Sequence, residues 1–307
     1  MAVFMFAVVV LFWLSVYISL NTTSKAVTTD TRKERNLDFS PPQLRKSAPK
    51  LPGAVLGAGS EKFAVIIRCH SGYAKHLLSL LWALEAQTVD DGIYVIIAPT
   101  EYESADLIDS TIQRKWPSDS KISVRVLQLE KEKYDEHCCL LKEICTPEWR
   151  KEKLLRKWSS EALETYCTVN SPLHYFVTDS ALEQAKRECV FCEYLVVTNA
   201  DNYYSPDFFW KTSQLMDRSK TDIVLTNMLH RGMPVETIVA SGAMDLGCVL
   251  SKFSIFLGSQ KLGFAKLVPE NAEPQDWHDA DFWMVHTLQN KYNRKVSFLR
   301  ETLFVHN

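Results

Sequence analysis

The chain has 307 residues, of which 46% are hydrophobic and 23% are charged. These values are ordinary for a globular protein and exclude a chain that is disordered throughout. The 35 basic and 37 acidic side chains leave a formal net charge of -2, so charge does not support nucleic acid as a partner. The eight cysteines are too few for a small disulfide scaffold but enough for one or two bridges in an oxidising compartment.

The N-terminal segment predicts a membrane anchor. Residues 2–20 carry no charged side chain, and a helix of this length spans about 30 Å, the thickness of a hydrocarbon core. A cleaved signal peptide is the alternative, but no basic side chain precedes the apolar run and the residues that end it make a poor cleavage site. We therefore expect an uncleaved transmembrane anchor at residues 1–20.

The signals for the orientation of this anchor conflict. The nearest basic residues all follow it, which by the positive-inside rule would place the rest of the chain in the cytosol. The glycosylation acceptor Asn21-Thr22-Thr23 and the eight cysteines favour the lumenal side instead. Residues 21–60 are rich in Pro, Ser, Thr and Lys and lack periodicity, so they are expected to form a flexible stem.

From residue 63 onward, continuous apolar runs alternate with amphipathic stretches, as in α/β proteins. The apolar runs predict buried strands at residues 63–67, 93–97, 123–127 and 194–198. The amphipathic stretches predict helices at residues 75–86, 104–115, 148–166, 180–187 and 281–289. This order predicts one α/β domain over residues 61–307, with helices on both faces of its sheet.

Ligands of open α/β sheets bind beyond the carboxyl ends of the strands. Directly after the run at 194–198 comes Asp201, flanked by Asn199 and Asn202. Carboxylate and amide oxygens are the ligands that Mg²⁺ and Mn²⁺ take. Asn and Asp also favour turns without any metal, so these residues alone leave a metal site and a plain turn equally open.

A second group of acids opens the helix expected at 281–289. Asp279 and Asp281 lie between Trp277 and Trp283. Acids at a helix start act as caps and suit the helix dipole, which is the simpler explanation. The two tryptophans indicate a cleft with an apolar wall, where a carboxylate could act as a base.

Histidine and cysteine give weaker signals. His306 follows an apolar run near the C-terminus, a position that is more often structural than a metal ligand. Cys189 and Cys192 have the spacing of a zinc-binding pair, but the chain lacks a clean second pair. Disulfide bridges or free thiols are the better interpretation of the cysteines.

With these motifs the chain resembles glycosyltransferases of the GT-A fold, closest to glycosyltransferase family 2. The likeness is carried by residues 63–88, 194–204, 278–283 and His306. It implies a Rossmann-like, mixed and mostly parallel sheet flanked by helices. It departs from the family in three places. Asn199 replaces the first acid of the Asp-x-Asp motif, and His278 replaces the Glu that normally precedes Asp279. The acid often found after the second strand, which binds the nucleotide in the family, is absent, and Pro99-Thr100-Glu101 stands in its place.

The resemblance also implies roles for individual residues. Asp279 matches the acid that serves as base in inverting members. Asp201 is the retained acid of the Asp-x-Asp motif and, with His306, would bind Mn²⁺ or Mg²⁺. Arg68, Glu101 and Asn199 would contact the nucleotide-sugar donor.

By this resemblance the chain is expected to be a metal-dependent, inverting glycosyltransferase that uses a nucleotide-sugar donor and a glycan, protein or lipid acceptor. The expected location is the Golgi or ER membrane, in a single-pass type II arrangement with a lumenal catalytic domain, which resolves the conflict over orientation. The alternative is a non-catalytic, membrane-tethered binding protein with a GT-A-like fold, which the incomplete Asp-x-Asp motif favours.

Overall fold

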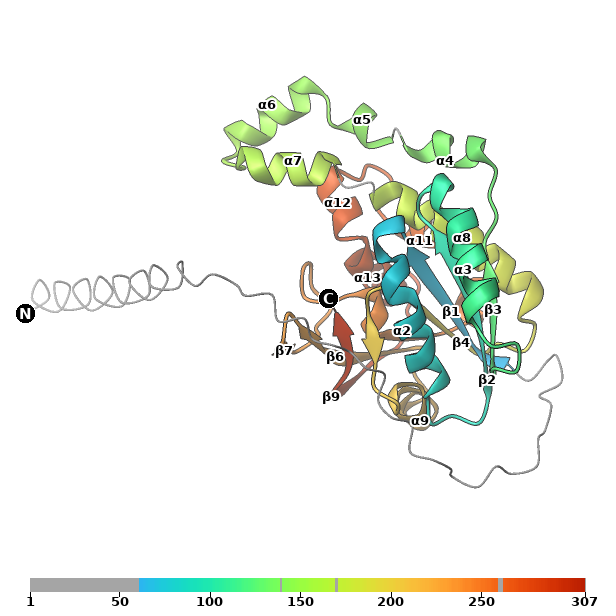
Figure 1. The fold of residues 1–307 in the computed structure, drawn as a ribbon. Helices are drawn as coiled ribbons and strands as arrows, with labels where there is room; N and C mark the ends of the chain where they lie inside the picture. The colour runs from blue at the N-terminus through green and yellow to red at the C-terminus, as the bar shows by residue number, and fades with distance from the viewer. Residues whose placement is uncertain (1–60, 139, 169–170, 259–261, 307) are drawn as a thin grey trace, which may run out of the picture. The chain divides into compact units, whose positions relative to one another are not determined.

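The computed structural model describes residues 61–138, 140–168, 171–258 and 262–306 (Figure 1). The anchor expected at 1–20 and the stem expected at 21–60 lie outside these residues. Within the described ranges, no helix has both the length and the apolar character needed to cross a membrane.

A mixed sheet forms the centre of the described domain. Its strands are β1 (Glu61–Cys69), β2 (Gly92–Pro99), β3 (Ile122–Val126), β4 (Tyr194–Asn199), β5 (Tyr203–Tyr204), β6 (Ile223–His230), β7 (Met233–Val235), β8 (Val249–Lys252) and β9 (Val296–His306). They follow the order β3-β2-β1-β4-β8-β6-β9-β5, and β7 pairs with β6. Strands β1 to β4 are parallel, β8 is antiparallel to both β4 and β6, and β9 is parallel to β6. This mostly parallel sheet with flanking helices fits a GT-A-like fold.

The central strands form where the sequence has continuous apolar runs. Every residue of β2 is buried, and so are seven consecutive residues of β1 from Phe63 to Cys69. Strands covered on both faces cannot alternate polar and apolar residues, which explains the unbroken runs. The strands predicted at 63–67, 93–97 and 194–198 are therefore confirmed, and the strand predicted at 123–127 is displaced by one residue.

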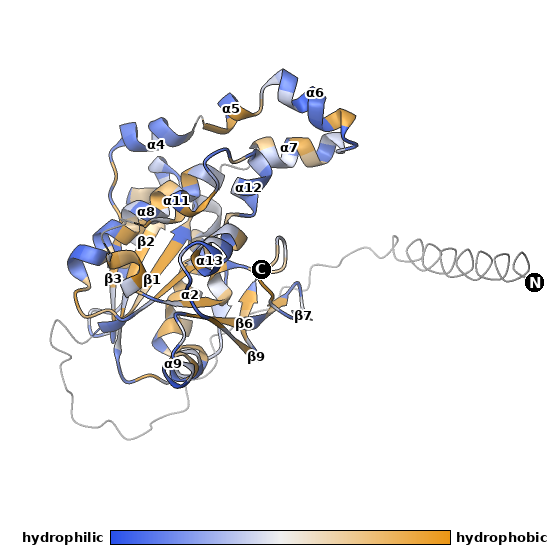
Figure 2. Ribbon diagram, turned by 180° about the vertical axis from the view of Figure 1, so that it is seen from behind, coloured by the Kyte–Doolittle hydropathy of each residue, from blue (hydrophilic) through white to orange (hydrophobic). Residues whose placement is uncertain are grey.

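Helices cover both faces of the sheet (Figures 1 and 2). They are α2 (Ala74–Glu85), α3 (Ala105–Lys115), α4 (Lys131–Cys138), α5 (Leu140–Ile144), α6 (Pro147–Leu155), α7 (Ser160–Thr168), α8 (Ser171–Glu188), α9 (Phe208–Ser219), α10 (Ser254–Leu257), α11 (Phe264–Leu267), α12 (Pro274–His278) and α13 (Ala280–Asn290). Helix α8 contacts β1 and β2, and α9 contacts β6 and β9. Figure 2 shows that the central strands are largely hydrophobic, whereas α4 and α6 are largely hydrophilic.

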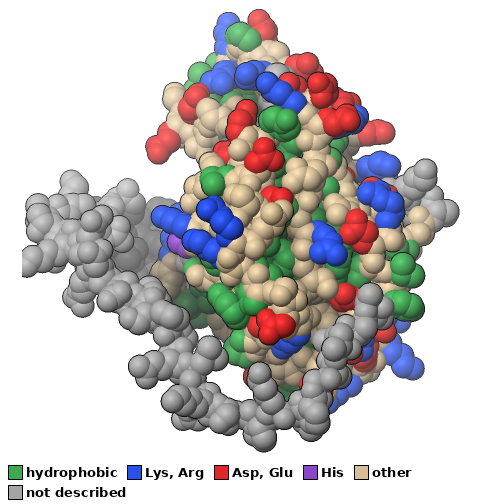
Figure 3. Space-filling view, turned by 45° about the vertical axis from the view of Figure 1, so that its right-hand side comes forward, with side chains coloured by type: hydrophobic (Ala, Val, Ile, Leu, Met, Phe, Trp, Pro, Cys, Tyr) green, Lys and Arg blue, Asp and Glu red, His purple; other side chains and the backbone are tan. Residues whose placement is uncertain are grey.

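Helices α4 to α7 form an insertion between β3 and α8, which we call the helical insertion (residues 131–168). In Figure 1 it lies beyond the carboxyl ends of the central strands. A disulfide joins Cys145 to Cys167 within it. Acidic and basic side chains are mixed over its surface in Figure 3, in keeping with the near-zero net charge.

The single helix predicted over residues 148–166 is wrong. The structure has two helices there, α6 and α7, because Lys157 adopts a left-handed conformation with φ of 68°. The Oγ atom of Ser159 then accepts a hydrogen bond from the backbone N–H of Ala162 at 3.0 Å, which caps the start of α7. The helix predicted at 180–187 is the second half of the longer helix α8.

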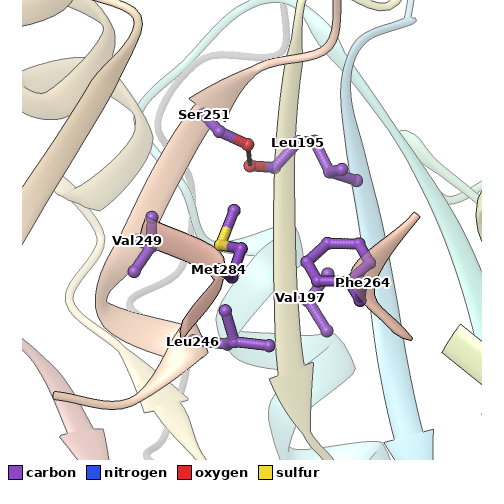
Figure 4. Close-up of a pocket in the computed structure, with 7 residues that line it drawn as sticks. All are labelled: Leu195, Val197, Leu246, Val249, Ser251, Phe264 and Met284. Atoms are coloured by element: carbon purple, nitrogen blue, oxygen red, sulfur yellow. Dashed lines mark hydrogen bonds between the residues drawn. The ribbon is translucent and has the colours of Figure 1, made fainter. Parts of the chain in front are cut away.

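A tightly packed seam joins β4 and β8 to helix α13 (Figure 4). Its walls are Leu195, Val197, Leu246, Val249, Ser251, Phe264 and Met284, and it leaves no room for a water molecule. The hydroxyl of Ser251 donates a hydrogen bond to the backbone oxygen of Leu195 at 3.3 Å. Since its polar group is satisfied and it has no space for a water molecule, this seam is part of the core and not a ligand site.

Candidate active site

A cavity of about 400 Å³ opens where the parallel strands end. Its walls come from the carboxyl ends of β1, β2 and β4, the first turn of α8, the α12–α13 region and the end of β9. The lining residues are Arg68, His70, Tyr73, Thr100, Ser171, His174, Tyr175, Asn199, Asp201, Asp245, His278, Asp281 and His306. This is the place where open α/β sheets bind ligands, and its size suits a small organic molecule.

Arg68 and Asn199 meet because they are register partners on the parallel strands β1 and β4. The Nε atom of Arg68 donates a hydrogen bond to Oδ1 of Asn199 at 2.9 Å. The guanidinium lies 5.2 Å from the ring centroid of Tyr175. Burial alone would lower the pKa of Arg68, but Tyr175, Asp281 and Asp245 outweigh it and raise the pKa. Arg68 is therefore a permanent cation in the cavity wall.

Asp281 lies in the first turn of α13 and lines the cavity. The hydroxyl of Tyr175 donates a hydrogen bond to its Oδ1, and the backbone N–H of Leu246 donates one to Oδ2 at 3.2 Å. Burial, and after it the neighbouring carboxylate of Asp245, raise the pKa of Asp281 although Arg68 acts in the opposite direction. A carboxylate with a raised pKa is a better proton acceptor, which is the property a general base needs.

Asp279, the predicted base, occupies a different place. It connects α12 to α13, and its Oδ2 accepts a hydrogen bond from the Oγ of Ser241 at 2.6 Å. Of the described residues in this segment, its neighbour His278 and Asp281 line the cavity and Asp279 does not. The role of Asp279 as a base stays a prediction, and the position of Asp281 makes it the stronger candidate.

Asp201 follows β4 in the tight turn to β5 and is 7% exposed. Burial raises its pKa, while the nearby His306 and His76 act to lower it. Burial, and after it the nearby carboxylate of Asp201, raise the pKa of Tyr73. The structure thus brings the predicted residues Arg68, Asn199 and Asp201 into one cavity wall.

His306, near the end of β9, also reaches this cavity. Its Nδ1 atom lies 3.1 Å from Oδ2 of Asp245, and this pairing with a carboxylate raises the pKa of His306. Asp245 is buried, and despite that burial the pairing with His306 holds the pKa of Asp245 below its ordinary value.

Glu101, which the resemblance assigned to the donor, lies at the rim. It follows β2, is exposed, and accepts a hydrogen bond from the backbone N–H of Ser71 at 3.1 Å. This hydrogen bond and the nearby His70 hold the pKa of Glu101 below its usual value against the effect of burial. Its neighbour Thr100, and not Glu101, is among the described residues that line the cavity.

A divalent cation needs oxygen or nitrogen ligands, and the cavity wall holds several such side chains. Among the residues described, no three His, Cys, Asp or Glu side chains are grouped closely enough to hold a metal by themselves. Mg²⁺ in nucleotide sites is usually bound by one or two protein ligands together with substrate phosphates. Asp201 offers carboxylate oxygens, and His306 has its Nδ1 on a carboxylate, as metal-binding histidines do, which leaves Nε2 as the second ring nitrogen. These two residues therefore fit a cation whose coordination a substrate completes.

Several cavity residues were not predicted from the sequence, among them Asp245, Tyr175 and His174. Asp245 lies in an aperiodic segment before β8, and Tyr175 and His174 lie within the first turns of a long helix. Burial, and after it the positive charge of Arg68, lower the pKa of His174 to about 4, so this imidazole is neutral near pH 7. No local pattern marks these residues, because their roles depend on which elements the fold places around the strand ends.

No protein-family model matches the chain, and no curated protein matches it. Matching solved structures include that of S. aureus TarS, with 13% identity and a TM-score of 0.46, and those of TarS residues 1–349 in complex with UDP (15%, 0.46) and with UDP-GlcNAc (14%, 0.43). Each match covers 80% of this chain but only 36%, 60% and 58% of the respective TarS chain.

Proposed function

We propose that this chain is a glycosyltransferase that moves a sugar from a nucleotide-sugar donor to an acceptor hydroxyl. One observation carries the proposal: the guanidinium of Arg68, the side chains of Asp201 and His306, and the Asp281 carboxylate with its raised pKa line a single cavity at the carboxyl ends of parallel strands. Sugar transfer from such a donor needs stabilisation of a leaving diphosphate and removal of a proton from the acceptor. The cavity offers groups for both tasks. The likeness to TarS points in the same direction but is too distant to carry the proposal.

The charges in the cavity explain how a diphosphate would be accommodated. Asp201, Asp245 and Asp281 contribute three carboxylates, and Arg68 is the one permanent cation among the described lining residues. This excess of negative charge would repel a diphosphate. A divalent cation held by Asp201 and His306 would offset it and stabilise the charge that develops on the leaving oxygen. Arg68 would bind the diphosphate directly with its guanidinium N–H groups that are not engaged with Asn199.

On the acceptor side, Asp281 would take the proton from the attacking hydroxyl. Tyr175 and the Leu246 backbone hold its carboxylate in place, so the base needs no reorganisation when the acceptor binds. A single in-line attack on the anomeric carbon inverts its configuration. An inverting, metal-dependent transfer is therefore part of the proposal.

The proposed location is the lumen of the Golgi or ER, with residues 1–20 as the membrane anchor and 21–60 as the stem of a type II protein. The disulfides Cys145–Cys167 and Cys189–Cys192 support an oxidising compartment. Of the other described cysteines, Cys69 and Cys248 are free and buried.

A non-catalytic binding protein is the second candidate, and the hydrogen bond between Asn199 and Arg68 favours it. That bond occupies the amide oxygen that stands in place of the first motif acid. The deciding experiment incubates the detergent-solubilised full chain with UDP-, GDP- and CMP-sugars, with and without Mn²⁺, and measures nucleotide release. We expect Mn²⁺-dependent release with one nucleotide class. Saturable binding of a nucleotide-sugar with no release, in the presence of acceptor extracts, would support the binding protein instead.

A further inference from the structure

We propose that Asp245 is a positioning residue that holds the imidazole of His306 in the cavity and selects which ring nitrogen is left for a divalent cation. The inference rests on the proposed function for its purpose, but the geometry behind it is independent of any reaction. Four residues form the arrangement: Asp245 and Gly247 on one side, and Phe304 and His306 on the other.

Both carboxylate oxygens of Asp245 are engaged. Oδ1 accepts a hydrogen bond from the backbone N–H of Gly247 at 2.7 Å, and Oδ2 lies 3.1 Å from Nδ1 of His306. The side chain is only 7% exposed. A buried carboxylate with one oxygen hydrogen-bonded and the other against an imidazole has little freedom to turn, so it presents a fixed acceptor to the histidine.

Gly247 allows the two chain segments to come this close. A Cβ atom at this position would lie 2.3 Å from two ring carbons of Phe304 and 2.9 Å from Oδ1 of Asp245. The ring of Phe304 is completely buried, so it has little freedom to move away. Glycine is therefore required by space, since the Phe304 ring occupies the volume that any side chain would need.

The two residues on each side of this arrangement have the same spacing along the chain. Phe304 and His306 are two residues apart on β9 and therefore point to the same face of the strand. They meet Gly247 and Asp245, which are two residues apart in the short turn that leads into β8. We call this arrangement the Asp245–Gly247 clamp. It anchors the end of β9 against the turn that leads into β8.

The clamp determines the state of the imidazole. A carboxylate can only accept, so its oxygen 3.1 Å from Nδ1 of His306 favours the tautomer that carries the proton on Nδ1. In the neutral ring, Nε2 then holds the lone pair, which is the nitrogen a metal would use. Without the carboxylate nothing described here selects this tautomer, because the neighbouring ring of His230, 4.8 Å away between centroids, stacks at a tilt.

The test compares the full-length wild type with Asp245→Ala and Asp245→Asn, all metal-free. Long-range ¹H–¹⁵N spectra, recorded above the pH at which His306 titrates, report which ring nitrogen is protonated. Mn²⁺ affinity is measured separately by electron paramagnetic resonance. We expect the Nδ1–H form in the wild type and a shift toward Nε2–H in Asp245→Ala. The affinity for Mn²⁺ should fall about 10–100-fold, the usual effect of losing such a partner, with a smaller loss in Asp245→Asn.

Asp179→Ala is the matched control. Asp179 is also a buried acid, and it accepts hydrogen bonds from the backbone N–H groups of Phe264 and Ala265 without lining the cavity. Its loss should lower stability and leave the His306 tautomer and Mn²⁺ affinity unchanged. An Nε2–H tautomer in the wild type, or Mn²⁺ affinity equal in wild type and Asp245→Ala, would overturn the inference. Neither readout needs turnover, so a chain that transfers no sugar but shows the shift would refute only the proposed function.

Discussion

The hydroxyl of Tyr175 donates a hydrogen bond to the carboxylate of Asp281, and this contact ties α8 to α13 across the wall of the cavity. The guanidinium of Arg68 also lies over the ring of Tyr175. One buried aromatic residue thus contacts both the cation and the carboxylate that the proposed reaction requires.

A matched pair of variants distinguishes Asp281 from Asp279 as the general base. Asp281→Asn and Asp279→Asn make the same chemical change two residues apart, and only Asp281 lines the cavity. Loss of a positioned base typically lowers the rate by about 10²–10⁴. We expect that loss in kcat for Asp281→Asn, and a change below about tenfold for Asp279→Asn, which loses only the contact with Ser241. The opposite ranking would return the role to Asp279, and a product of retained configuration would rule out both.

Tyr175→Phe should change the pH dependence more than the maximal rate. The hydrogen bond from Tyr175 lowers the pKa of Asp281, against the larger effect of burial. Removing the hydroxyl therefore raises that pKa further. A base works in its deprotonated form, so activity is lost as pH falls through the pKa, and the acidic limb of the kcat/KM profile should move to higher pH. The profile of Phe176→Leu, in the same helix, serves as the comparison. An acidic limb that stays in place in Tyr175→Phe would show that Asp281 is not the titrating base.

Metal removal tests the cation site. Treatment with a chelator should abolish sugar transfer, and added Mn²⁺ should restore it in the wild type. Asp201→Asn keeps the volume of the side chain but offers a weaker ligand, so Mn²⁺ should restore little activity at concentrations that saturate the wild type. Circular dichroism checks that the variant is folded. Full activity of the wild type after exhaustive chelation would contradict the metal-dependent mechanism.

Arg68 contributes to stability as well as to donor binding. Arg68→Met removes the positive charge beside the cavity carboxylates, and leaving a buried charge without its partner typically costs about 3–5 kcal/mol. Arg68→Lys keeps the charge but not the fork of donors, so it should retain most of the stability and still bind a nucleoside diphosphate more weakly. Urea unfolding and calorimetric titration measure the two effects separately. If Arg68→Met and Arg68→Lys lost the same stability and the same affinity for a nucleoside diphosphate, the positive charge would have no special role in either property.

The Cys145–Cys167 disulfide should stabilise the helical insertion locally. The cysteines are 22 residues apart, and closing a loop of this size stabilises by about 3 kcal/mol in the chain-entropy model. Replacing both cysteines by serine should expose α5 to α7 to proteolysis, while the sheet keeps its hydrogen-exchange protection. Tyr166 of α7 lies with its ring 5.1 Å from that of His278 at the cavity, so acceptor binding should weaken more than donor binding. Unchanged protease resistance in the double variant would show that helix packing alone holds the insertion.

The sheet and half of the site could be predicted from sequence for one physical reason. Strands buried on both faces must be continuously apolar, and the residue after such a strand lies at a known edge of the sheet. Arg68, Asn199 and Asp201 follow from this rule, because parallel pairing brings the ends of β1 and β4 together. Asp245 follows from no such rule. Its partner His306 becomes a neighbour only because β9 is inserted beside β6, and long-range strand order has no local signal.

Local sequence also could not predict the helix break within residues 148–166, or which of Asp279 and Asp281 lies at the cavity. The charged stretch at 148–166 has a helical pattern throughout, and only the left-handed Lys157 with the capping Ser159 divides it. Between Asp279 and Asp281, capping and catalysis require the same residue type. Composition could not decide between them, whereas the packing of α13 against Tyr175 and Leu246 does place Asp281 at the cavity.

The position of β9 has a consequence for how the protein is made. His306 follows every other cavity residue in the chain, and β9 lies between β6 and β5 in the sheet. On the ribosome, the segments up to β8 emerge first, and until β9 arrives β6 presents an open edge and β5 lacks its pairing strand. The nascent protein is therefore exposed to wrong strand pairing until β9 emerges and pairs with β6 and β5. The same late event that closes this gap delivers the imidazole, so a newly made chain acquires its protection from aggregation and its complete cavity together.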